Sequence, residues 1–311
     1  MNIQRELPGI QKNVKLASYT TFKIGGPAEY FFEAKTREDL IKAIKTAKKF
    51  KMPFFILSGG SNTLVSDKGY KGLVVRFKNS GLTLRRAQGD AEQGQNIKFK
   101  NCEIICEAGT PLAELIKESV GNGLSGLEWV AGIPGTIGGA IRGNAGAFGK
   151  SMADVVERVE LLEINSELRI KSYESKDCRF GYRNSIFKEK NNLIVLSAEV
   201  RLKTDDKEKI KESIERYLNY RKEKHPLEFP SAGSVFENPE GHSAAKLIEE
   251  CGLKGKKIGQ AQISEKHANF IINLGQAKAK DVCRLIDLAK EKVKDKFGII
   301  LKEEIKFLGF S

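Results

Sequence analysis

The sequence predicts an α+β fold that comprises more than one domain. The chain has 311 residues, which is about two domains at the usual scale of ~150 residues each. Its first part alternates short apolar runs with amphipathic helical stretches, and its last part combines two helical patterns with apolar strands. Two glycine-rich stretches lie far apart in sequence, at residues 58–64 and 131–147. This arrangement favours two subdomains that hold one long cofactor between them.

Composition excludes several classes of protein. Hydrophobic residues make up 40% of the chain and charged residues 30%, which excludes a wholly disordered, collagen-like or fibrous chain. No run of about 18 apolar residues occurs, so no membrane insertion is expected. The first ten residues lack a basic stretch followed by an apolar run, so we expect no secretory signal.

The cysteines and histidines predict a cytoplasmic protein without a metal centre. The cysteines are odd in number and include no Cys-x-x-Cys pair, which argues against a disulfide framework and a zinc site. The histidines lie too far apart in sequence to form a local metal motif. These residues are Cys102, Cys106, Cys178, Cys251, Cys283, His225, His242 and His267.

The net charge of +13 first suggests a nucleic-acid partner, but its distribution argues against one. Of the 53 basic residues, 39 are Lys and 14 are Arg, and they are spread along the chain. A solvated lysine surface explains this pattern, and attraction of an anionic small substrate is the alternative. We expect no nucleic-acid binding, and the sequence names no protein partner.

The first part of the chain predicts a β-α-β unit. Residues 30–34 form an aromatic strand pattern, and Thr36 with Asp39 gives a helix N-terminal capping pattern. Apolar residues at helical spacing follow until Pro53, where the helix must end. Residues 54–57 then predict a short buried strand.

Further strands and helices are expected along the rest of the chain. Strand patterns occur at residues 73–77, 103–107, 155–164, 168–173, 193–203, 269–273 and 299–308. Helical patterns occur after Thr110-Pro111 and at residues 206–223, 243–251 and 280–297. Thr110 is expected to cap the first of these helices and Pro111 to open it. Residues 79–101 predict a surface loop or hairpin. We place boundaries near 75 and 208, which gives segments 1–75, 76–208 and 209–311.

Two glycine motifs resemble nucleotide-binding signatures without their context. Gly121, Gly123 and Gly126 match G-x-G-x-x-G, but a helix precedes them where a dinucleotide site requires a strand. We therefore expect Gly121 or Gly123 to end that helix in a left-handed conformation. Gly149-Lys150-Ser151 resembles the end of a P-loop, but Asn144 stands where that motif needs a glycine.

The two longer glycine-rich stretches are stronger candidates for a ligand site. The first directly follows the strand at 54–57, and successive small residues there can turn backbone N–H groups toward an anion. An ordinary strand-to-loop turn is the alternative. The second, at residues 131–147, is rich in Gly, Ile and Ala, which permits close approach of the backbone to a flat ligand and is unlike a flexible linker.

Six blocks in order resemble a known enzyme family, the UDP-N-acetylenolpyruvoylglucosamine reductases, also called UDP-N-acetylmuramate dehydrogenases. The blocks extend over nearly the whole chain, from about residue 14 to 308. They resemble the shorter form of the family, which lacks an extra substrate-capping segment. The blocks are TTFKIGGPA (20–28), ILSGGSNTLV (56–65), EWVAGIPGTIGGAIRGNAGA (128–147), YRNSIF (182–187), SAGSVFENP (231–239) and LKEEI (301–305).

The resemblance implies a fold and a reaction. The fold is a two-subdomain FAD-binding scaffold of the vanillyl-alcohol-oxidase type with a separate α+β substrate-binding domain. The reaction is the NADPH-dependent reduction of the enolpyruvyl ether of UDP-N-acetylglucosamine to UDP-N-acetylmuramate, a step of peptidoglycan synthesis. NADPH is the implied co-substrate. No cysteine lies in the two glycine-rich stretches, so FAD is expected to bind without a covalent link.

The resemblance also assigns catalytic roles, and the residue types suit them. Hydride addition at C3 of the enolpyruvyl group leaves negative charge at C2 and on the carboxylate. Arg183 and Glu304 flank this enolate, and a guanidinium can bind a carboxylate through two hydrogen bonds. Ser234 protonates C2, a role that a weak acid can fill because the acceptor is strongly basic. The alternation around Glu304 predicts a strand but does not select Glu304 over Glu303.

The remaining site residues follow from the same alignment. Substrate contacts are assigned to Tyr182, Lys224, Asn238 and His267. Lys222 competes with Lys224 for the diphosphate, and His267 stands where some relatives carry Gln. FAD contacts are assigned to Ser58, Gly59, Gly60, Ser61, Asn62, Thr63, Gly132, Ile133, Pro134, Gly135, Thr136, Gly138, Gly139 and Arg142.

Two alternatives remain at this point. A flavin-dependent oxidase of a hydroxy acid or sugar on the same scaffold would share both glycine loops but not Arg183, Ser234 and Glu304 in their blocks. A nucleic-acid binder would show steep salt-dependent affinity for DNA and no flavin colour.

Overall fold

The computed structural model describes residues 3–86 and 101–310, and the chain divides into two compact units. Unit 1 comprises residues 1–33, 43–76 and 221–311. Unit 2 comprises residues 34–42 and 77–220. The expected boundary near 75 lies beside the observed one, whereas the expected boundary near 208 precedes the observed one at residues 220–221. Unit 1 combines most of the expected first segment with most of the expected last one. The division into three functional domains stays a prediction.

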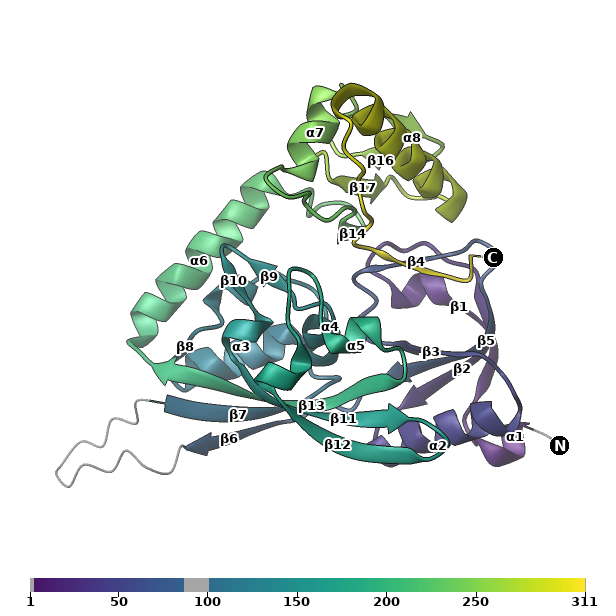
Figure 1. Cartoon of the computed structure of the whole chain (residues 1–311), viewed down its shortest axis with the longest axis vertical. Helices are drawn as coiled ribbons and strands as arrows, with labels where there is room; N and C mark the ends of the chain where they lie inside the picture. Colours follow the sequence, from purple (N-terminus) through teal and green to yellow (C-terminus); the bar gives the residue numbers. More distant parts are fainter. Residues whose placement is uncertain (1–2, 87–100, 311) are drawn as a thin grey trace. The chain divides into compact units, whose positions relative to one another are not determined.

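Unit 2 is built on a mixed-length antiparallel sheet with the order β12-β11-β13-β7-β6, in which β8 also pairs with β13. Helices α3 and α4 lie on one face of this sheet (Figure 1). The strands are β6 (Leu82–Arg86), β7 (Asn101–Glu107), β8 (Leu124–Ser125), β11 (Val156–Ile164), β12 (Leu168–Glu174) and β13 (Leu193–Thr204), with a separate hairpin of β9 (Gly146–Ala147) and β10 (Lys150–Ser151). The helices are α3 (Leu112–Gly121), α4 (Ile137–Arg142), α5 (Ile186–Glu189) and α6 (Lys207–Lys224), whose last turn enters unit 1.

Unit 1 contains two four-stranded sheets, with the orders β1-β2-β5-β3 and β14-β17-β16-β15, and a parallel pair, β4 with β18. Its strands are β1 (Gln11–Lys15), β2 (Pro27–Ala34), β3 (Phe54–Leu57), β4 (Thr63–Val65), β5 (Tyr70–Phe77), β14 (Ser231–Ser234), β15 (Lys257–Ile258), β16 (Ala261–Ile263), β17 (Phe270–Asn273) and β18 (Lys306–Leu308). Its helices are α1 (Ile3–Glu6), α7 (Ala244–Glu250) and α8 (Ala279–Phe297), and α2 (Arg37–Lys49) begins in unit 2.

The strand, helix and second strand of the predicted β-α-β unit are present as β2, α2 and β3, and β5 lies between the two strands in the sheet. Helix α2 begins after Thr36, whose Oγ1 accepts a hydrogen bond from the Asp39 backbone N–H at 3.1 Å, and the Asp39 carboxylate accepts one from the Thr36 N–H at 3.2 Å. This reciprocal cap satisfies two otherwise unpaired donors of the first turn. Strand β3 follows Pro53 and pairs in parallel with β5.

The two ends of the chain share one hydrophobic core in unit 1. Phe22, Ile24 and Leu64 are buried together with apolar residues of α7, α8 and the last sheet. The Asp67 carboxylate adds a polar link, because it accepts hydrogen bonds from the first backbone N–H groups of α8, Ala279 at 2.8 Å and Lys280 at 3.1 Å. A negative charge at a helix N-terminus is favourable, so Asp67 caps a helix that lies more than 200 residues away.

The local structure differs from expectation at Thr110 and in the strand at 299–308. Thr110 does not cap α3: its hydroxyl is fully buried and hydrogen-bonded to Gly81, and Pro111 occupies the N-cap position itself. The strand expected at 299–308 is shorter, since β18 covers only its last residues. The helix α3 ends as predicted, with Gly123 in the left-handed region at φ +66°. The interval 79–101, expected to be a loop or hairpin, contains strand β6. Its residues 87–100 lie outside the described residues.

The hairpin β9–β10 explains the P-loop-like sequence. Phe148 at φ +55° and Gly149 at φ +75° form its two-residue turn, as expected for a tight turn that matches strand twist. A P-loop would require a strand before the glycine-rich turn and a helix after it. Gly149, Lys150 and Ser151 are therefore turn and strand residues.

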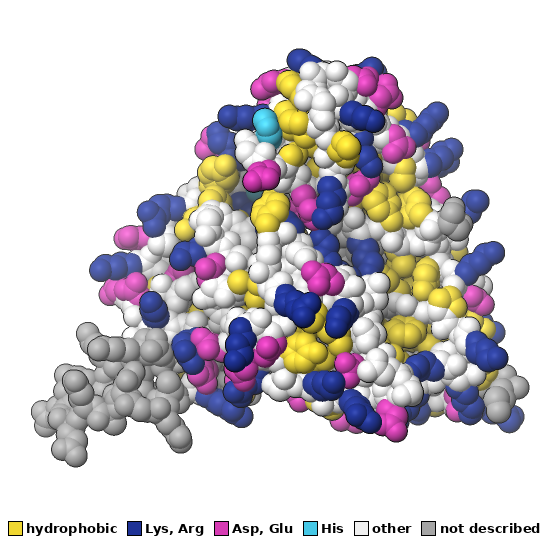
Figure 2. Space-filling view, in the orientation of Figure 1, with side chains coloured by type: hydrophobic (Ala, Val, Ile, Leu, Met, Phe, Trp, Pro, Cys, Tyr) yellow, Lys and Arg dark blue, Asp and Glu magenta, His cyan; other side chains and the backbone are white. Residues whose placement is uncertain are grey.

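The surface charge is mixed. Figure 2 shows Lys and Arg side chains interspersed with Asp and Glu over the visible face. Many form exposed ion pairs, such as Arg158 with Glu174 at 2.9 Å across β11 and β12. Pairs of this kind contribute little to stability, and their even distribution favours the solvated lysine surface. Within residues 3–86 and 101–310, no helix is long and apolar enough to cross a membrane.

Candidate active site

The loop of residues 58–63 joins β3 to β4 and presents backbone donors. Two of its carbonyl groups accept hydrogen bonds from other segments. The Gly60 carbonyl accepts one from the Thr21 N–H at 3.2 Å, and the Asn62 carbonyl accepts one from the Lys306 N–H at 2.9 Å. Within the described part of the chain, the N–H groups of Gly59, Gly60, Ser61 and Asn62 donate no hydrogen bond. Four neighbouring donors of this kind suit the oxygens of a phosphate or pyrophosphate. The loop therefore fits the diphosphate of FAD.

Gly60 is required by the backbone of this loop. It has φ +63°, and a Cβ atom at this position would lie 2.1 Å from the Tyr19 carbonyl oxygen. Both the conformation and the close approach exclude a larger residue. The Tyr19 backbone thus packs directly against Gly60 of the loop.

We expect Gly60→Ala to lose both stability and flavin content. A left-handed non-glycine residue costs about 1–3 kcal/mol, and the clash with the Tyr19 carbonyl adds to that cost. Gly241→Ala is the matched control, because Gly241 also has φ +71° but has nothing within 4 Å of its added Cβ. Thermal unfolding and the flavin absorbance of purified protein measure both effects. Equal losses in the two variants would show that Gly60 has no special role.

The backbone of Glu304 contacts both this loop and Val235, the residue after Ser234, in unit 1. Ser234 ends β14 after a bulge, in which Gly233 has φ +75°. The next residue, Val235, accepts a hydrogen bond on its carbonyl from the Glu304 N–H at 2.8 Å. The Asn62 side-chain amide donates to the Glu304 carbonyl at 3.1 Å. The structure thus brings together two predicted catalytic residues and the predicted cofactor loop.

The structure separates the two glutamates that the sequence could not distinguish. Glu303 pairs with Phe236 in a single antiparallel bridge, and its carboxylate forms an ion pair with Lys290 of α8 at 2.8 Å. Glu304 is half-buried and lies next to Val235 and Asn62. The carboxylate of Glu303 is thus bound to α8, and Glu304 stays the predicted catalytic residue. Sequence alternation could not show this, since Lys290 lies on another element.

The second glycine-rich stretch forms a turn and a short helix in unit 2. Gly132 and Gly135 have φ +79° and +133°, and Thr136 is the N-cap of α4. Gly138 is explained by packing, since its added Cβ would lie 2.9 Å from the Ala108 Cβ. Its N–H donates to the Ala108 carbonyl at 2.8 Å. These contacts position residues 132–136 at the end of β7.

Arg183 is displayed by a tight turn beside this stretch. Gly181 and Asn184 exchange two backbone hydrogen bonds of 3.0 and 3.1 Å, and Arg183 between them has φ +52°. A non-glycine residue in this region is strained, and such strain is often found at functional positions. The guanidinium lies over the Tyr182 ring, 5.3 Å from its centroid, and Tyr182 is 58% exposed.

Residues 142–146 hold this turn in place. The Asn144 side-chain amide donates to the Gly181 carbonyl at 2.8 Å, and the Ser185 hydroxyl donates to the Arg142 carbonyl at 2.7 Å. An added Cβ at Gly146 would lie 3.3 Å from Nη1 of Arg183. The motif blocks at residues 128–147 and 182–187 are therefore hydrogen-bonded to each other in unit 2. Burial lowers the pKa of the Arg142 guanidinium, which lies 3.4 Å from the Asn191 side-chain oxygen.

The other predicted substrate residues are engaged in local contacts. The Asn238 side-chain oxygen accepts from the Ala244 N–H at 3.0 Å, which helps to start α7. Lys224 forms an exposed ion pair with Glu223 at 2.6 Å. The Lys222 carbonyl accepts from Nζ of Lys266 at 2.6 Å, which caps the end of α6. The choice between Lys222 and Lys224 stays open.

His267 has a partner that the sequence did not indicate, His225. Their ring centroids are 5.4 Å apart, and both rings contact Phe270. Nδ1 of His267 accepts a hydrogen bond from the Asn269 N–H at 3.3 Å, so the neutral ring carries its proton on Nε2. Burial lowers the pKa of His267. Burial first, and then the charges of His267, Arg221 and Lys266, lower the pKa of His225 to about 4.

We expect this histidine pair to make the fold sensitive to acid. An unfolded histidine takes up a proton near pH 6.5, whereas His225 in the folded protein does so only near pH 4. The contribution of neutral His225 to the free energy of unfolding is therefore fully present above pH 6.5 and is lost as the pH falls toward 4. After a discount for partial exposure, His225→Phe should reduce this loss by ~1 kcal/mol, or about 2–4 °C in Tm. Thermal unfolding at pH 7.0, 5.5 and 4.5 measures it, with the exposed His242→Gln as control. An unchanged pH profile in His225→Phe contradicts the prediction.

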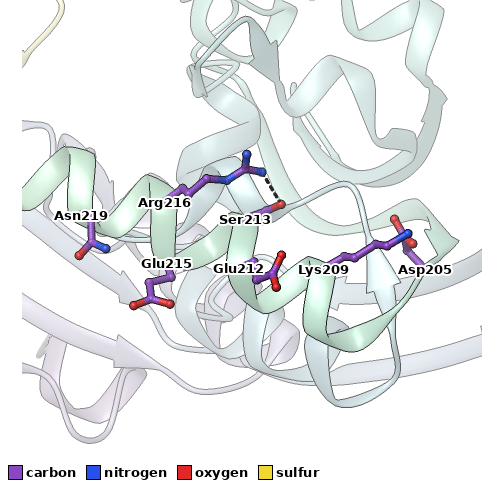
Figure 3. A pocket seen from close by; sticks show the side chains of 7 residues that line it. All are labelled: Asp205, Lys209, Glu212, Ser213, Glu215, Arg216 and Asn219. Atoms are coloured by element: carbon purple, nitrogen blue, oxygen red, sulfur yellow. Dashed lines mark hydrogen bonds between the residues drawn. The ribbon is translucent and has the colours of Figure 1, made fainter.

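A separate hollow of about 580 Å³ lies along the start of α6 (Figure 3). It is lined by charged and polar side chains that project from α6 and from Asp205. None of the predicted site residues borders it. Its residues are Asp205, Lys209, Glu212, Ser213, Glu215, Arg216 and Asn219. Among the described residues, no cluster of three His, Cys, Asp or Glu side chains could hold a metal ion.

Comparison with known proteins identifies the family. A family model described as UDP-N-acetylenolpyruvoylglucosamine reductase, C-terminal domain, matches residues 225–308, and one described as FAD binding domain matches residues 28–170. A UDP-N-acetylenolpyruvoylglucosamine reductase of Caldanaerobacter subterraneus is 44% identical over 297 residues, which cover 96% of this chain and 93% of that protein. The chain belongs to the UDP-N-acetylenolpyruvoylglucosamine reductase family. A relative of that name from Alkaliphilus oremlandii is 42% identical over 294 residues, which cover 94% of this chain and 91% of that protein.

A solved structure of this reductase family agrees with the fold. The crystal structure of the Thermus caldophilus enzyme is 35% identical and has a TM-score of 0.76. The comparison covers 96% of this chain and 99% of that one. The predicted α+β fold with an FAD-binding scaffold is therefore confirmed, as is the prediction of a flavin-dependent oxidoreductase. The family model for FAD binding includes both glycine-rich stretches.

Proposed function

We propose that the protein reduces UDP-N-acetylglucosamine enolpyruvate to UDP-N-acetylmuramate at the expense of NADPH, as a cytoplasmic step of peptidoglycan precursor synthesis. The observation that carries this proposal is that the Glu304 backbone bonds both to Asn62 of the 58–63 loop and to Val235, the residue after Ser234. A carboxylate and a hydroxyl beside a loop that suits a flavin diphosphate provide the groups that reduction of an enolpyruvyl ether needs. Bound FAD would supply the hydride transfer from NADPH to C3 of the enolpyruvyl group.

Arg183 binds the carboxylate of the enolpyruvyl group in this proposal. Hydride addition at C3 places negative charge on C2 and the carboxylate, and a guanidinium stabilises that charge through two parallel hydrogen bonds. Its turn is fixed by Asn144 and Ser185, so little reorganisation is needed when the charge develops. Tyr182 packs along the guanidinium and limits its motion.

Ser234 donates the proton to C2. Its place at the end of β14, after the Gly233 bulge, gives the side chain a defined direction at the edge of the sheet. A hydroxyl is a poor acid, but the acceptor here is a carbanion-like enolate, so a positioned donor is effective. Glu304, whose backbone N–H bonds to the carbonyl of Val235 just after this strand, flanks the enolate together with Arg183 and helps to stabilise it.

Anionic substrate groups require cations and hydrogen-bond donors, which the remaining candidates supply. Lys224 or Lys222 would bind the diphosphate as a point charge, and Asn238 would bind phosphate or sugar oxygens. His267 would donate from Nε2, the nitrogen that its bond from Asn269 leaves protonated. A Gln at this position in relatives would provide an equivalent N–H donor.

The absorption spectrum of the purified protein and the mass of its reaction product test this proposal. We expect the absorption bands of bound oxidised flavin and substrate-dependent oxidation of NADPH. Mass spectrometry of the product should show the substrate with two added hydrogen atoms, formed in equal amount to the NADP⁺. A hydroxy-acid or sugar oxidase would instead consume oxygen with its own substrate and leave the enolpyruvyl compound unchanged.

A further inference from the structure

Thr21 occupies a position that links the cofactor loop to the strand of Ser234. Its backbone N–H donates to the Gly60 carbonyl at 3.2 Å. Its hydroxyl donates to the Ser231 carbonyl at 2.7 Å, and the Ser61 carbonyl lies 3.4 Å from the same hydroxyl. Ser231 begins β14 and Ser234 ends it. One threonine therefore contacts the loop and the strand at once.

The bond of this link to the strand depends on the Thr21 hydroxyl, which the neighbouring residues do not replace. The preceding residue, Thr20, is buried, and its hydroxyl makes only contacts of 3.4 Å with the carbonyls of Ala17 and Ile24. The carbonyl of the next residue, Phe22, accepts from the Asn273 side-chain amide at 3.0 Å, which anchors the segment to β17, the neighbour of β14. Residues 20–22 thus lie against both elements, and only Thr21 bonds to each of them.

We propose that Thr21 is a positioning residue that sets the place of Ser234 relative to the cofactor loop. The bond of 2.7 Å fixes the start of β14, and the bulge at Gly233 makes the end of this short strand dependent on where it starts. The bond to the Gly60 carbonyl and the contact with the Ser61 carbonyl fix the loop on the other side. Proton transfer is sensitive to displacements of a fraction of an ångström, so loss of this hydroxyl should misalign the proton donor. The proposal rests on the proposed function, in which Ser234 protonates C2.

The test compares the two half-reactions in anaerobic rapid mixing. In Thr21→Val, which removes the hydroxyl and keeps the shape, we expect flavin reduction by NADPH within about 3-fold of the unmodified protein. Reoxidation by UDP-N-acetylglucosamine enolpyruvate should be at least ~10-fold slower, and its solvent deuterium isotope effect should increase because protonation becomes limiting. Thr21→Ser should restore reoxidation, and Thr20→Val should leave both half-reactions unchanged.

A double-mutant cycle separates positioning from a general structural role. If Thr21 acts through Ser234, then Thr21→Val adds little to the defect of Ser234→Ala. Equal slowing of both half-reactions, an additive effect in the double variant, or no effect on reoxidation would each overturn the proposal. Failure of the unmodified protein to reoxidise with this substrate would instead refute the proposed function, and the positioning role with it. Ser234→Ala distinguishes failure of the proposed function from failure of the positioning role, since its reoxidation is slow whenever the proposed function holds.

Discussion

Arg183→Lys slows reoxidation of the reduced protein by UDP-N-acetylglucosamine enolpyruvate about 10²-fold or more, and leaves flavin reduction by NADPH within a few-fold of normal. Lysine keeps the charge but loses the planar pair of donors that matches a carboxylate. Removal of one donor that stabilises developing negative charge typically costs 10²–10³ in rate. The turn of Gly181 and Asn184 involves backbone bonds, so it persists in the variant.

Arg179→Lys is the matched control for this substitution. Arg179 also has a left-handed backbone, at φ +48°, and it is exposed four residues earlier in the same unit. We expect it to behave like the unmodified protein. Near-full turnover of Arg183→Lys would contradict the carboxylate role, and a defect equal to that of Arg179→Lys would indicate a local folding effect.

Ser234→Ala should have the second large effect, again in reoxidation alone. A positioned proton donor contributes about 10²–10⁴-fold, and alanine retains the small volume that β14 accommodates. NADPH reduction does not involve protonation of C2 and should remain nearly normal. Stopped-flow absorbance of the flavin measures both rates. Ser231→Ala, at the other end of β14, is the control, since among the residues that the structure describes its hydroxyl makes a single long bond, from the Gly233 N–H at 3.4 Å. Equal loss in both half-reactions would exclude Ser234 as the proton donor.

The regular elements could be predicted because their signals are local. The cap of Thr36 and Asp39, the stop at Pro53 and the apolar run 54–57 lie within one short stretch, and the structure confirms α2 and β3 there. The left-handed end of α3 at Gly123 is equally local. Thr110 shows the limit of local signals. Its sequence matches a helix-capping pattern, but its hydroxyl hydrogen-bonds to the backbone of Gly81 and does not cap α3.

The site could be predicted only in part, because its organisation depends on long-range contacts. The resemblance named Ser234, Glu304 and the 58–63 loop, but their meeting depends on bonds such as that of Asn62 with Glu304, 242 positions apart. The ion pair that engages Glu303 and the pairing of His225 with His267 likewise join separate elements. No spacing rule in one sequence reveals such contacts, and Thr21 in particular carries no chemical signature of its own.

Anaerobic reoxidation of the NADPH-reduced protein tests the central claim most directly. The reduced, bleached protein is mixed with UDP-N-acetylglucosamine enolpyruvate or with UDP-N-acetylglucosamine, which lacks the enolpyruvyl group. We predict that the first restores the flavin absorbance within the time of one turnover and that the second does not. Recovery of colour with oxygen alone, and none with the enolpyruvyl compound, would contradict the proposed reaction.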